Sequence, residues 1–179
     1  DPHQGAVLLH DGFTGQLLAV LNASPITEIR TAAVSAVATK LLARPGSRTV
    51  AVLGSGVQGR SHVDAMQTVL EDPIVRIWSR NPAHAEALAL ETHSLVAASV
   101  EEALDGADIV CTATAASDPI VELGWLAPGT HINAAGAFPN GRARERGARC
   151  AGRACGIGSS RRGSSRAPAF TSKRRSAAA

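Results

Sequence analysis

Cysteines and long apolar runs are scarce in this chain of 179 residues. Its three cysteines, Cys111, Cys150 and Cys155, are too few for a disulfide framework and do not have the spacing of a zinc site. No run of about 18 apolar residues is present, so we expect no membrane-spanning helix. No basic segment followed by an apolar core marks a signal peptide at the N-terminus. A reducing, cytoplasmic setting without a protein-bound metal fits these absences best.

Acidic residues are almost absent from the end of the chain. Residues 141–179 contain 11 Lys and Arg and one acid, Glu145, whereas residues 1–140 contain 7 Lys and Arg and 14 Asp and Glu. This tail has few large apolar side chains and no helical or strand period, so we expect it to be disordered. A basic arm for nucleic acid or an acidic membrane is one interpretation, but no aromatic residues are interleaved for base stacking. We favour an out-of-frame reading of a GC-rich gene near residue 140, and we expect no nucleic acid partner.

The most informative motif is a Gly-x-Gly-x-x-Gly that follows an apolar, β-branched run. The run Thr49–Leu53 predicts a strand, and residues 57–70 predict a helix. Gly54 permits the tight turn, Gly56 lets a pyrophosphate approach the backbone, and Gly59 lets helix and strand pack closely. The helix N-terminus then offers free N–H groups to the phosphates. This strand–turn–helix predicts a dinucleotide site, the alternative being a turn that only connects two elements.

The next predicted strand, residues 74–79, suggests which dinucleotide. It ends at Ser79-Arg80-Asn81, where an NAD-preferring site usually carries an Asp or Glu for the ribose 2′-hydroxyl. Arg80 would attract a 2′-phosphate through charge-assisted hydrogen bonds, so NADP(H) is favoured over NAD(H). The alternative is an ordinary solvated arginine at a strand end.

Strands and helices alternate through most of the chain. We expect a hairpin of residues 6–10 and 16–21, a helix over 25–43 capped by Ser24, and then strands at 49–53, 74–79, 95–98, 108–114 and 131–135 with helices at 57–70, 82–91 and 99–105. This order predicts an α/β protein with a Rossmann-type, doubly wound parallel sheet. The expected domains are a partial dimerisation and substrate domain at 1–48, a dinucleotide-binding domain at 49–140 and the tail at 141–179.

In order and spacing, several blocks resemble the ornithine cyclodeaminase/mu-crystallin family. They are Ile29–Ala36, Leu53–His62, Val75–Arg80, Gly106–Val110 and Trp125–Gly136. The resemblance covers about residues 3 to 140 and implies NAD(P)-linked chemistry at an amino or imino carbon in a homodimeric parent protein. It also implies which residues contact the cofactor, namely those of the glycine motif and the positions that match the family's other nucleotide contacts. These residues are His3, Gly54, Ser55, Gly56, Val57, Gln58, Gly59, Ser79, Arg80, Asn81, Thr114, Ala115 and Ala135. Arg30 and Thr31 would contact the substrate.

The departures from the family decide the expected activity. The chain begins at Asp1 without the family's N-terminal substrate residues, so we expect a fragment. Phe138 stands where cyclodeaminases carry an Asp, and no catalytic residue can be assigned. Ketimine reductase-like reduction of an imine beside a carboxylate is therefore expected. The alternatives are ornithine cyclodeaminase activity, or a non-catalytic NADPH- or small-ligand-binding or inactive truncated product. Cys111 is expected to be an inert core thiol, and His62 a surface or packing residue.

Overall fold

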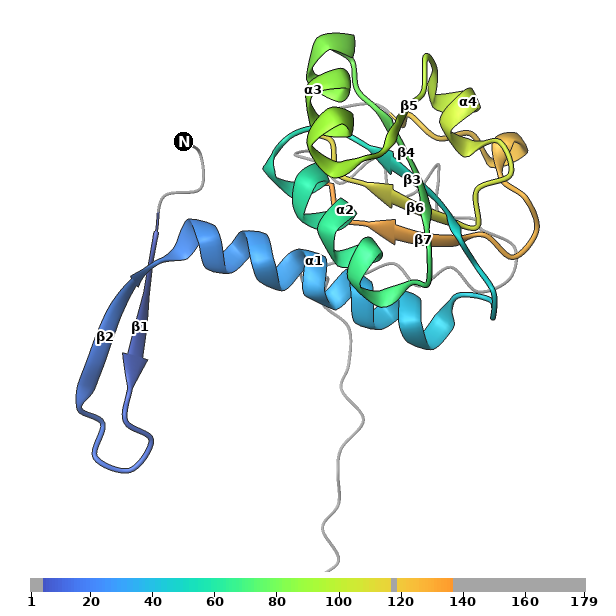
Figure 1. Ribbon diagram of the computed structural model, residues 1–179. Helices are drawn as coiled ribbons and strands as arrows, with labels where there is room; N and C mark the ends of the chain where they lie inside the picture. The colour runs from blue at the N-terminus through green and yellow to red at the C-terminus, as the bar shows by residue number, and fades with distance from the viewer. Residues whose placement is uncertain (1–4, 117–118, 137–179) are drawn as a thin grey trace, which may run out of the picture.

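The computed structural model describes residues 5–116 and 119–136 (Figure 1). The elements are, in order, β1 (Ala6–His10), β2 (Leu17–Asn22), α1 (Ala23–Leu42), β3 (Thr49–Leu53), α2 (Val57–Val69), β4 (Ile74–Trp78), α3 (Pro82–Thr92), β5 (Leu95–Val96), α4 (Val100–Leu104), β6 (Ile109–Thr112), the 3-10 turn η1 (Leu123–Trp125) and β7 (His131–Ala134). The expected hairpin and the alternating α/β order are confirmed. The tail at 141–179 lies outside the described residues.

The centre of the molecule is a five-stranded parallel sheet with the order β5-β4-β3-β6-β7. The central strand β3 is apolar and buried from Val50 to Leu53, because helices cover both faces of a doubly wound sheet. The chain runs outward from β3 to β4 and β5, then returns to β6 on the other side. The strand order therefore reverses between β3 and β6, and ligands of such sheets bind at this point, beyond the carboxyl ends of the strands.

Each face of the sheet has its own apolar core. On one face, α2 and α3 pack on side chains from β3, β4 and β6, among them Val50, Ile77 and Ile109. On the other face, α4 covers Leu53 and Val110 with Leu104. Because the sheet is covered on both sides, its strands carry runs of apolar residues instead of an alternating pattern.

Helix α1 begins earlier than expected. The N-cap is Asn22, whose side chain accepts a hydrogen bond from the Ser24 N–H at 3.0 Å, so the expectation that Ser24 caps the helix is wrong. Pro25 falls in the first turn, where its missing N–H costs nothing. The buried face of α1 consists of small residues, Ala32, Ser35, Ala36, Ala38 and Thr39, and this face packs against α2 and β7.

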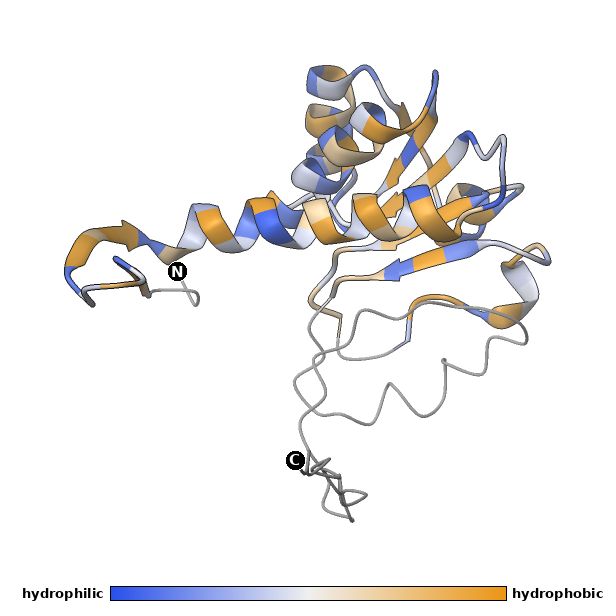
Figure 2. Cartoon of the chain, turned by 90° about the horizontal axis from the view of Figure 1, so that it is seen from below, coloured by the Kyte–Doolittle hydropathy of each residue, from blue (hydrophilic) through white to orange (hydrophobic). Residues whose placement is uncertain are grey.

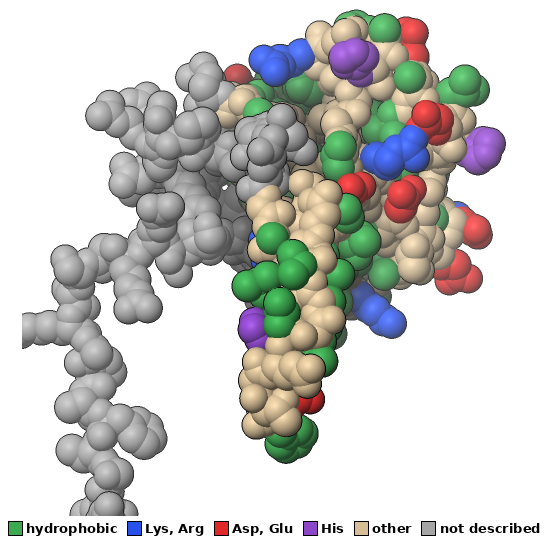
Figure 3. Space-filling model, turned by 90° about the vertical axis from the view of Figure 1, so that its left-hand side faces the viewer, with side chains coloured by type: hydrophobic (Ala, Val, Ile, Leu, Met, Phe, Trp, Pro, Cys, Tyr) green, Lys and Arg blue, Asp and Glu red, His purple; other side chains and the backbone are tan. Residues whose placement is uncertain are grey.

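The β1–β2 hairpin lies at the far end of α1, away from the five-stranded sheet (Figure 1). Its side chains are apolar yet exposed; Leu8 is 56% exposed and Val20 63% exposed. Figures 2 and 3 show the apolar character of the β1–β2 hairpin. A two-stranded hairpin alone is marginally stable in water. Within the described residues, no helix combines the length and apolarity that crossing a bilayer requires.

Candidate dinucleotide site

The loop between β3 and α2 lies at the carboxyl end of the central strand. The Gly54 N–H donates to the Trp78 carbonyl at 2.8 Å, and the Ala113 N–H donates to the Leu53 carbonyl at 2.8 Å. These bonds tie the loop to the ends of β4 and β6, its two neighbours in the sheet. The glycine motif is therefore held at the point where the strand order reverses.

The three glycines of the motif have three different surroundings. Gly54 has φ +122°, and a Cβ there would lie 2.5 Å from the Ala113 carbonyl oxygen. A Cβ on Gly59 would overlap the Gly54 carbonyl, so this glycine is required for helix and strand to approach. A Cβ on Gly56 would meet nothing within 4 Å. Gly54 and Gly59 are therefore required by the fold itself, whereas at Gly56 the protein leaves open space above the backbone.

The N-terminus of α2 faces this open space with its amide groups. The N-cap is Gly56, no side chain caps the helix, and no acidic residue lies in its first turn. Val57 is 61% exposed. The first N–H groups of a helix have no intrahelical partner and carry partial positive charge, so this turn can bind an anion such as a phosphate. The absence of a cap and the room above Gly56 fit a pyrophosphate.

The end of β4 supplies polar groups beside the glycine loop. Ser55 Oγ donates to Ser79 Oγ at 2.8 Å, which joins the loop to this strand end. Asn81 is the N-cap of α3, where its side chain accepts from the Ala83 N–H at 3.2 Å. Arg80 between them is exposed, and within residues 5–116 and 119–136 it makes no hydrogen bond or ion pair.

The carboxyl ends of β6 and β7 complete the edge. The Ala135 N–H donates to the Thr112 carbonyl at 3.0 Å, and Thr114 Oγ1 accepts from the Ala116 N–H at 3.0 Å. A Cβ on Gly136 would lie 2.6 Å from the Thr114 carbonyl oxygen, so the two strand ends approach closely. The structure thus brings Thr114 and Ala135 to the same sheet edge as the glycine loop and Ser79–Asn81, with Ala115 exposed beside them.

The two predicted substrate residues lie on helix α1, which packs against α2. Arg30 is exposed, and Thr31 Oγ1 donates to the Thr27 carbonyl at 2.7 Å, so this hydroxyl is already bonded within the helix. Glu28, two residues before Arg30, accepts a hydrogen bond from Ser61 Oγ of α2 at 2.8 Å, so this part of α1 lies beside the beginning of α2. The remaining predicted cofactor residue, His3, lies outside the described residues, as does Phe138.

Sequence reasoning missed a set of buried polar bonds beneath the site. Of the two interpretations of His62, as a surface or a packing residue, the structure has the second: the side chain is fully buried, with Ser35 Oγ 3.0 Å from its Nε2. Asn133 Nδ2 donates to Thr39 Oγ1 at 2.8 Å and lies 3.7 Å from Cys111 Sγ. Cys111 is fully buried, as expected of a core thiol, and burial raises the pKa of this thiol to about 12. The sequence carries one signal for these bonds: a polar residue stands at a position that the helical or strand periodicity assigns to the buried face.

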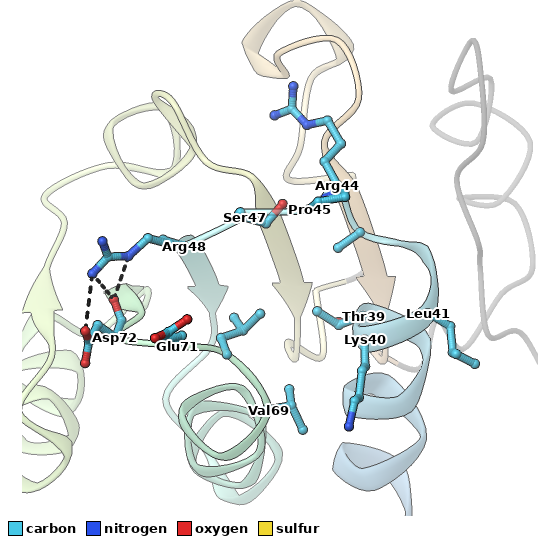
Figure 4. A pocket seen from close by; sticks show the side chains of 13 residues that line it. Thr39, Lys40, Leu41, Arg44, Pro45, Ser47, Arg48, Val69, Glu71 and Asp72 are labelled. Carbon is cyan, nitrogen blue, oxygen red and sulfur yellow. Dashed lines mark hydrogen bonds and ion pairs between the residues drawn. The ribbon is translucent and has the colours of Figure 1, made fainter.

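A cavity of about 700 Å³ lies at the opposite, amino edge of the sheet (Figure 4). Two arginines around it already have partners. Arg48 donates to the Asp72 carbonyl at 3.0 Å, and Arg44 pairs with Asp108 at 3.0 Å. Residues 44–48 precede β3, so the cavity is far along the strand from the glycine loop. Its position excludes it as the place where the glycine motif would hold phosphates.

The comparisons with known proteins agree with this geometry. The profile described as "Ornithine cyclodeaminase/mu-crystallin family" matches residues 2–144. The ketimine reductase mu-crystallin of Mus musculus is 47% identical over 137 residues, which is 75% of this chain and 44% of that protein. The Delta(1)-pyrroline-2-carboxylate reductase of Paracoccus denitrificans is 37% identical over 141 residues, 75% of this chain and 45% of that protein.

Solved structures show the same arrangement. The Thermococcus litoralis Delta(1)-pyrroline-2-carboxylate reductase, solved with NADH and L-proline, has a TM-score of 0.65 and 36% identity over 72% of this chain and 42% of that one. An archaeal alanine dehydrogenase dimer with bound NAD has a TM-score of 0.67 and 29% identity over 72% and 41% of the two chains. The chain spans less than half the length of these relatives. Its matched residues, parallel sheet and glycine loop establish that the chain belongs to the ornithine cyclodeaminase/mu-crystallin family.

Proposed function

We propose that this chain is the dinucleotide-binding part of an NAD(P)H-dependent reductase that acts on a carbon–nitrogen double bond beside a carboxylate. The observation that carries the proposal is the open space above Gly56 at the uncapped N-terminus of α2. When bound, the cofactor would supply the hydride. Two of the similar proteins are named as reductases of cyclic imines or ketimines, which supports this class of substrate.

The residues of the sheet edge have separate roles in the proposed complex. Amide groups of Ser55 to Gln58 would bind the pyrophosphate, and Ser79, Arg80 and Asn81 would lie beside the adenosine ribose. Thr114, Ala115 and Ala135, at the ends of β6 and β7, would flank the remainder of the dinucleotide. On α1, Arg30 would attract the substrate carboxylate, because an arginine offers a planar pair of donors.

We propose further that NADPH is preferred to NADH. Ser79, Arg80 and Asn81 contain no carboxylate to repel a 2′-phosphate, and the Arg80 guanidinium has no partner within the described ranges. Loss of one charge-assisted contact in Arg80→Ala should weaken NADPH binding by about 1.5–3 kcal/mol and NADH binding much less.

Titration of both cofactors into the wild type, Arg80→Ala and Arg48→Ala tests the proposal. Arg48→Ala is the matched control, because it removes another exposed arginine at the opposite edge of the sheet. Equal losses for the two cofactors in Arg80→Ala would contradict the assignment of Arg80. A wild type that binds neither cofactor would contradict the dinucleotide site itself.

The exposed hairpin favours a homodimer as the form of the whole protein. Leu8, Leu9 and Leu18 are each at least half exposed on a two-stranded sheet that is marginal by itself. One of the similar structures is described as a dimer. Sedimentation velocity over a range of concentrations, with Leu8→Glu as the variant, would test this: the wild type should dimerise, and a variant that dimerises equally well would contradict a role for the hairpin.

A further inference from the structure

His62 lies in α2, one turn after Gln58, and its side chain has no exposed surface. Both of its ring nitrogens nevertheless have partners. Nδ1 lies 2.6 Å from the Gln58 carbonyl oxygen of the same helix, and Nε2 lies 3.0 Å from Ser35 Oγ of α1. A buried polar side chain that satisfies both nitrogens in this way is held in one orientation.

The partners determine where the protons are. A carbonyl oxygen can only accept, so Nδ1 must carry a hydrogen and donate it to Gln58. Burial lowers the pKa of His62, and the hydrogen bond to the Gln58 carbonyl raises it by a smaller amount. The pKa therefore lies below its ordinary value, and the ring is neutral at pH 7. Nε2 is therefore an acceptor, and the Ser35 hydroxyl donates to it. The hydrogen bonds run in one direction, from Ser35 to His62 to Gln58.

This chain of bonds joins two parts of the candidate site. Gln58 belongs to the first turn of α2, whose amide groups face the open space at Gly56. Ser35 lies one turn after Thr31 on the buried face of α1. Through the bonds of the His62 ring, the Gln58 carbonyl of this turn is connected to Ser35 of α1 by a buried side chain.

We infer that His62 and Ser35 are positioning residues that fix the phosphate-binding turn of α2 against helix α1. The expected effect on ligand affinity rests on the proposed dinucleotide function. If the first turn of α2 is already fixed, no conformational entropy is lost in ordering its amide groups when the phosphates bind. Removal of the Ser35 hydroxyl leaves Nε2 buried without a donor, and the ring is then free to release Gln58.

The matched control lies one turn further along the same helix. Thr39 is 1% exposed and Ser35 3% exposed, and Thr39 Oγ1 also makes a buried hydrogen bond, to Asn133 of β7 at 2.8 Å. Thr39→Val removes this bond but leaves the bonds to α2 intact. Ser35→Ala and Thr39→Val should therefore lower the melting temperature alike, and only Ser35→Ala should affect the first turn of α2.

Three measurements on the full chain test the inference. Amide hydrogen exchange at residues 60–62, whose N–H groups are the first of α2 to bond back into its first turn, should rise about tenfold in Ser35→Ala and stay unchanged in Thr39→Val. The dissociation constant for NADPH should likewise increase about tenfold in Ser35→Ala alone. The 15N chemical shifts of the His62 ring in the wild type should place its single proton on Nδ1.

Equal exchange in the two variants, or a His62 proton on Nε2, would overturn the inference. The tautomer measurement needs only the wild type, so it decides the matter even if Ser35→Ala does not fold. A wild type that binds no dinucleotide would contradict the proposed function, and in that case exchange and the tautomer still decide whether His62 and Ser35 position the turn.

Discussion

Replacement of Gly56 by alanine should strongly weaken dinucleotide binding and leave the fold intact. The backbone at Gly56 has φ −79° and ψ −171°, an extended conformation open to any residue, and the added Cβ would meet nothing within 4 Å. Alanine is a poorer N-cap than glycine, but it restricts the unfolded chain. Each effect changes the free energy of unfolding by about 0.5–1 kcal/mol, the first lowering it and the second raising it. The melting temperature should therefore change by less than about 4 °C.

The effect on binding should be much larger, because the new methyl group would occupy the space that a pyrophosphate needs to reach the amide groups. Loss of two charge-assisted hydrogen bonds of about 1.5 kcal/mol each corresponds to a loss of affinity of at least about 100-fold. Fluorescence titration with NADPH, beside a thermal melt of the same sample, measures both quantities.

The control for this variant is Gly12→Ala in the hairpin turn, where an added Cβ would also meet nothing within 4 Å. It should change neither the affinity nor the melting temperature appreciably. A Gly56→Ala variant that binds NADPH as tightly as the wild type would refute our reasoning about the open space. A variant that unfolds would show that Gly56, like Gly59, is required by the fold.

Other parts of the molecule give further expectations. Gly59→Ala should lower the free energy of unfolding in urea by about 1–3 kcal/mol or more, because its Cβ would overlap the Gly54 carbonyl; an unchanged urea midpoint would contradict this. Asp108→Ala should cost about 1–3 kcal/mol in the same assay, because Asp108 accepts from the N–H groups of Arg48 and Thr49 at 3.0 and 3.1 Å and pairs with Arg44. Burial lowers the pKa of His62 and His131 below the ordinary 6.5, so the unfolded chain binds more protons just below that pH. Their contribution to stability is therefore complete above pH 6.5 and is lost as the pH falls toward the folded-state values; a melting temperature that stays level from about pH 7 to 5 would contradict it.

Elements whose signals are local were predictable from the sequence. Strand β3 and the start of α2 follow from an apolar β-branched run that ends on three glycines, and the structure has them at 49–53 and from residue 57. The expected helix over 82–91 begins as predicted, with Asn81 as the N-cap and Pro82 in the first turn, and ends one residue later than expected, at Thr92, where His93 adopts the left-handed conformation. Each of these signals lies within the element that it defines, so no knowledge of the tertiary structure is needed.

Errors arise where two signals compete or where a contact joins distant residues. Asn22 and Ser24 are both good N-caps, and the hairpin strand that ends at Asn22 selects the first. The strand expected at 108–114 is limited to 109–112, because Asp108 binds the loop before β3 and Thr114 forms a turn with Ala116. Ser35 and His62 come from different helices, so their hydrogen bond depends on how α1 packs on α2, which no local pattern encodes.

The central claim is that the carboxyl edge of the sheet binds a dinucleotide through the glycine loop. An NADPH titration followed by 15N–1H NMR of the full chain tests it most directly, since each amide reports its own surroundings. Our account predicts progressive shifts at residues 54–59 and 79–81, with Arg48 and Asp72 at the opposite cavity unchanged. Shifts confined to that cavity, or no shifts at all with excess NADPH, would contradict it.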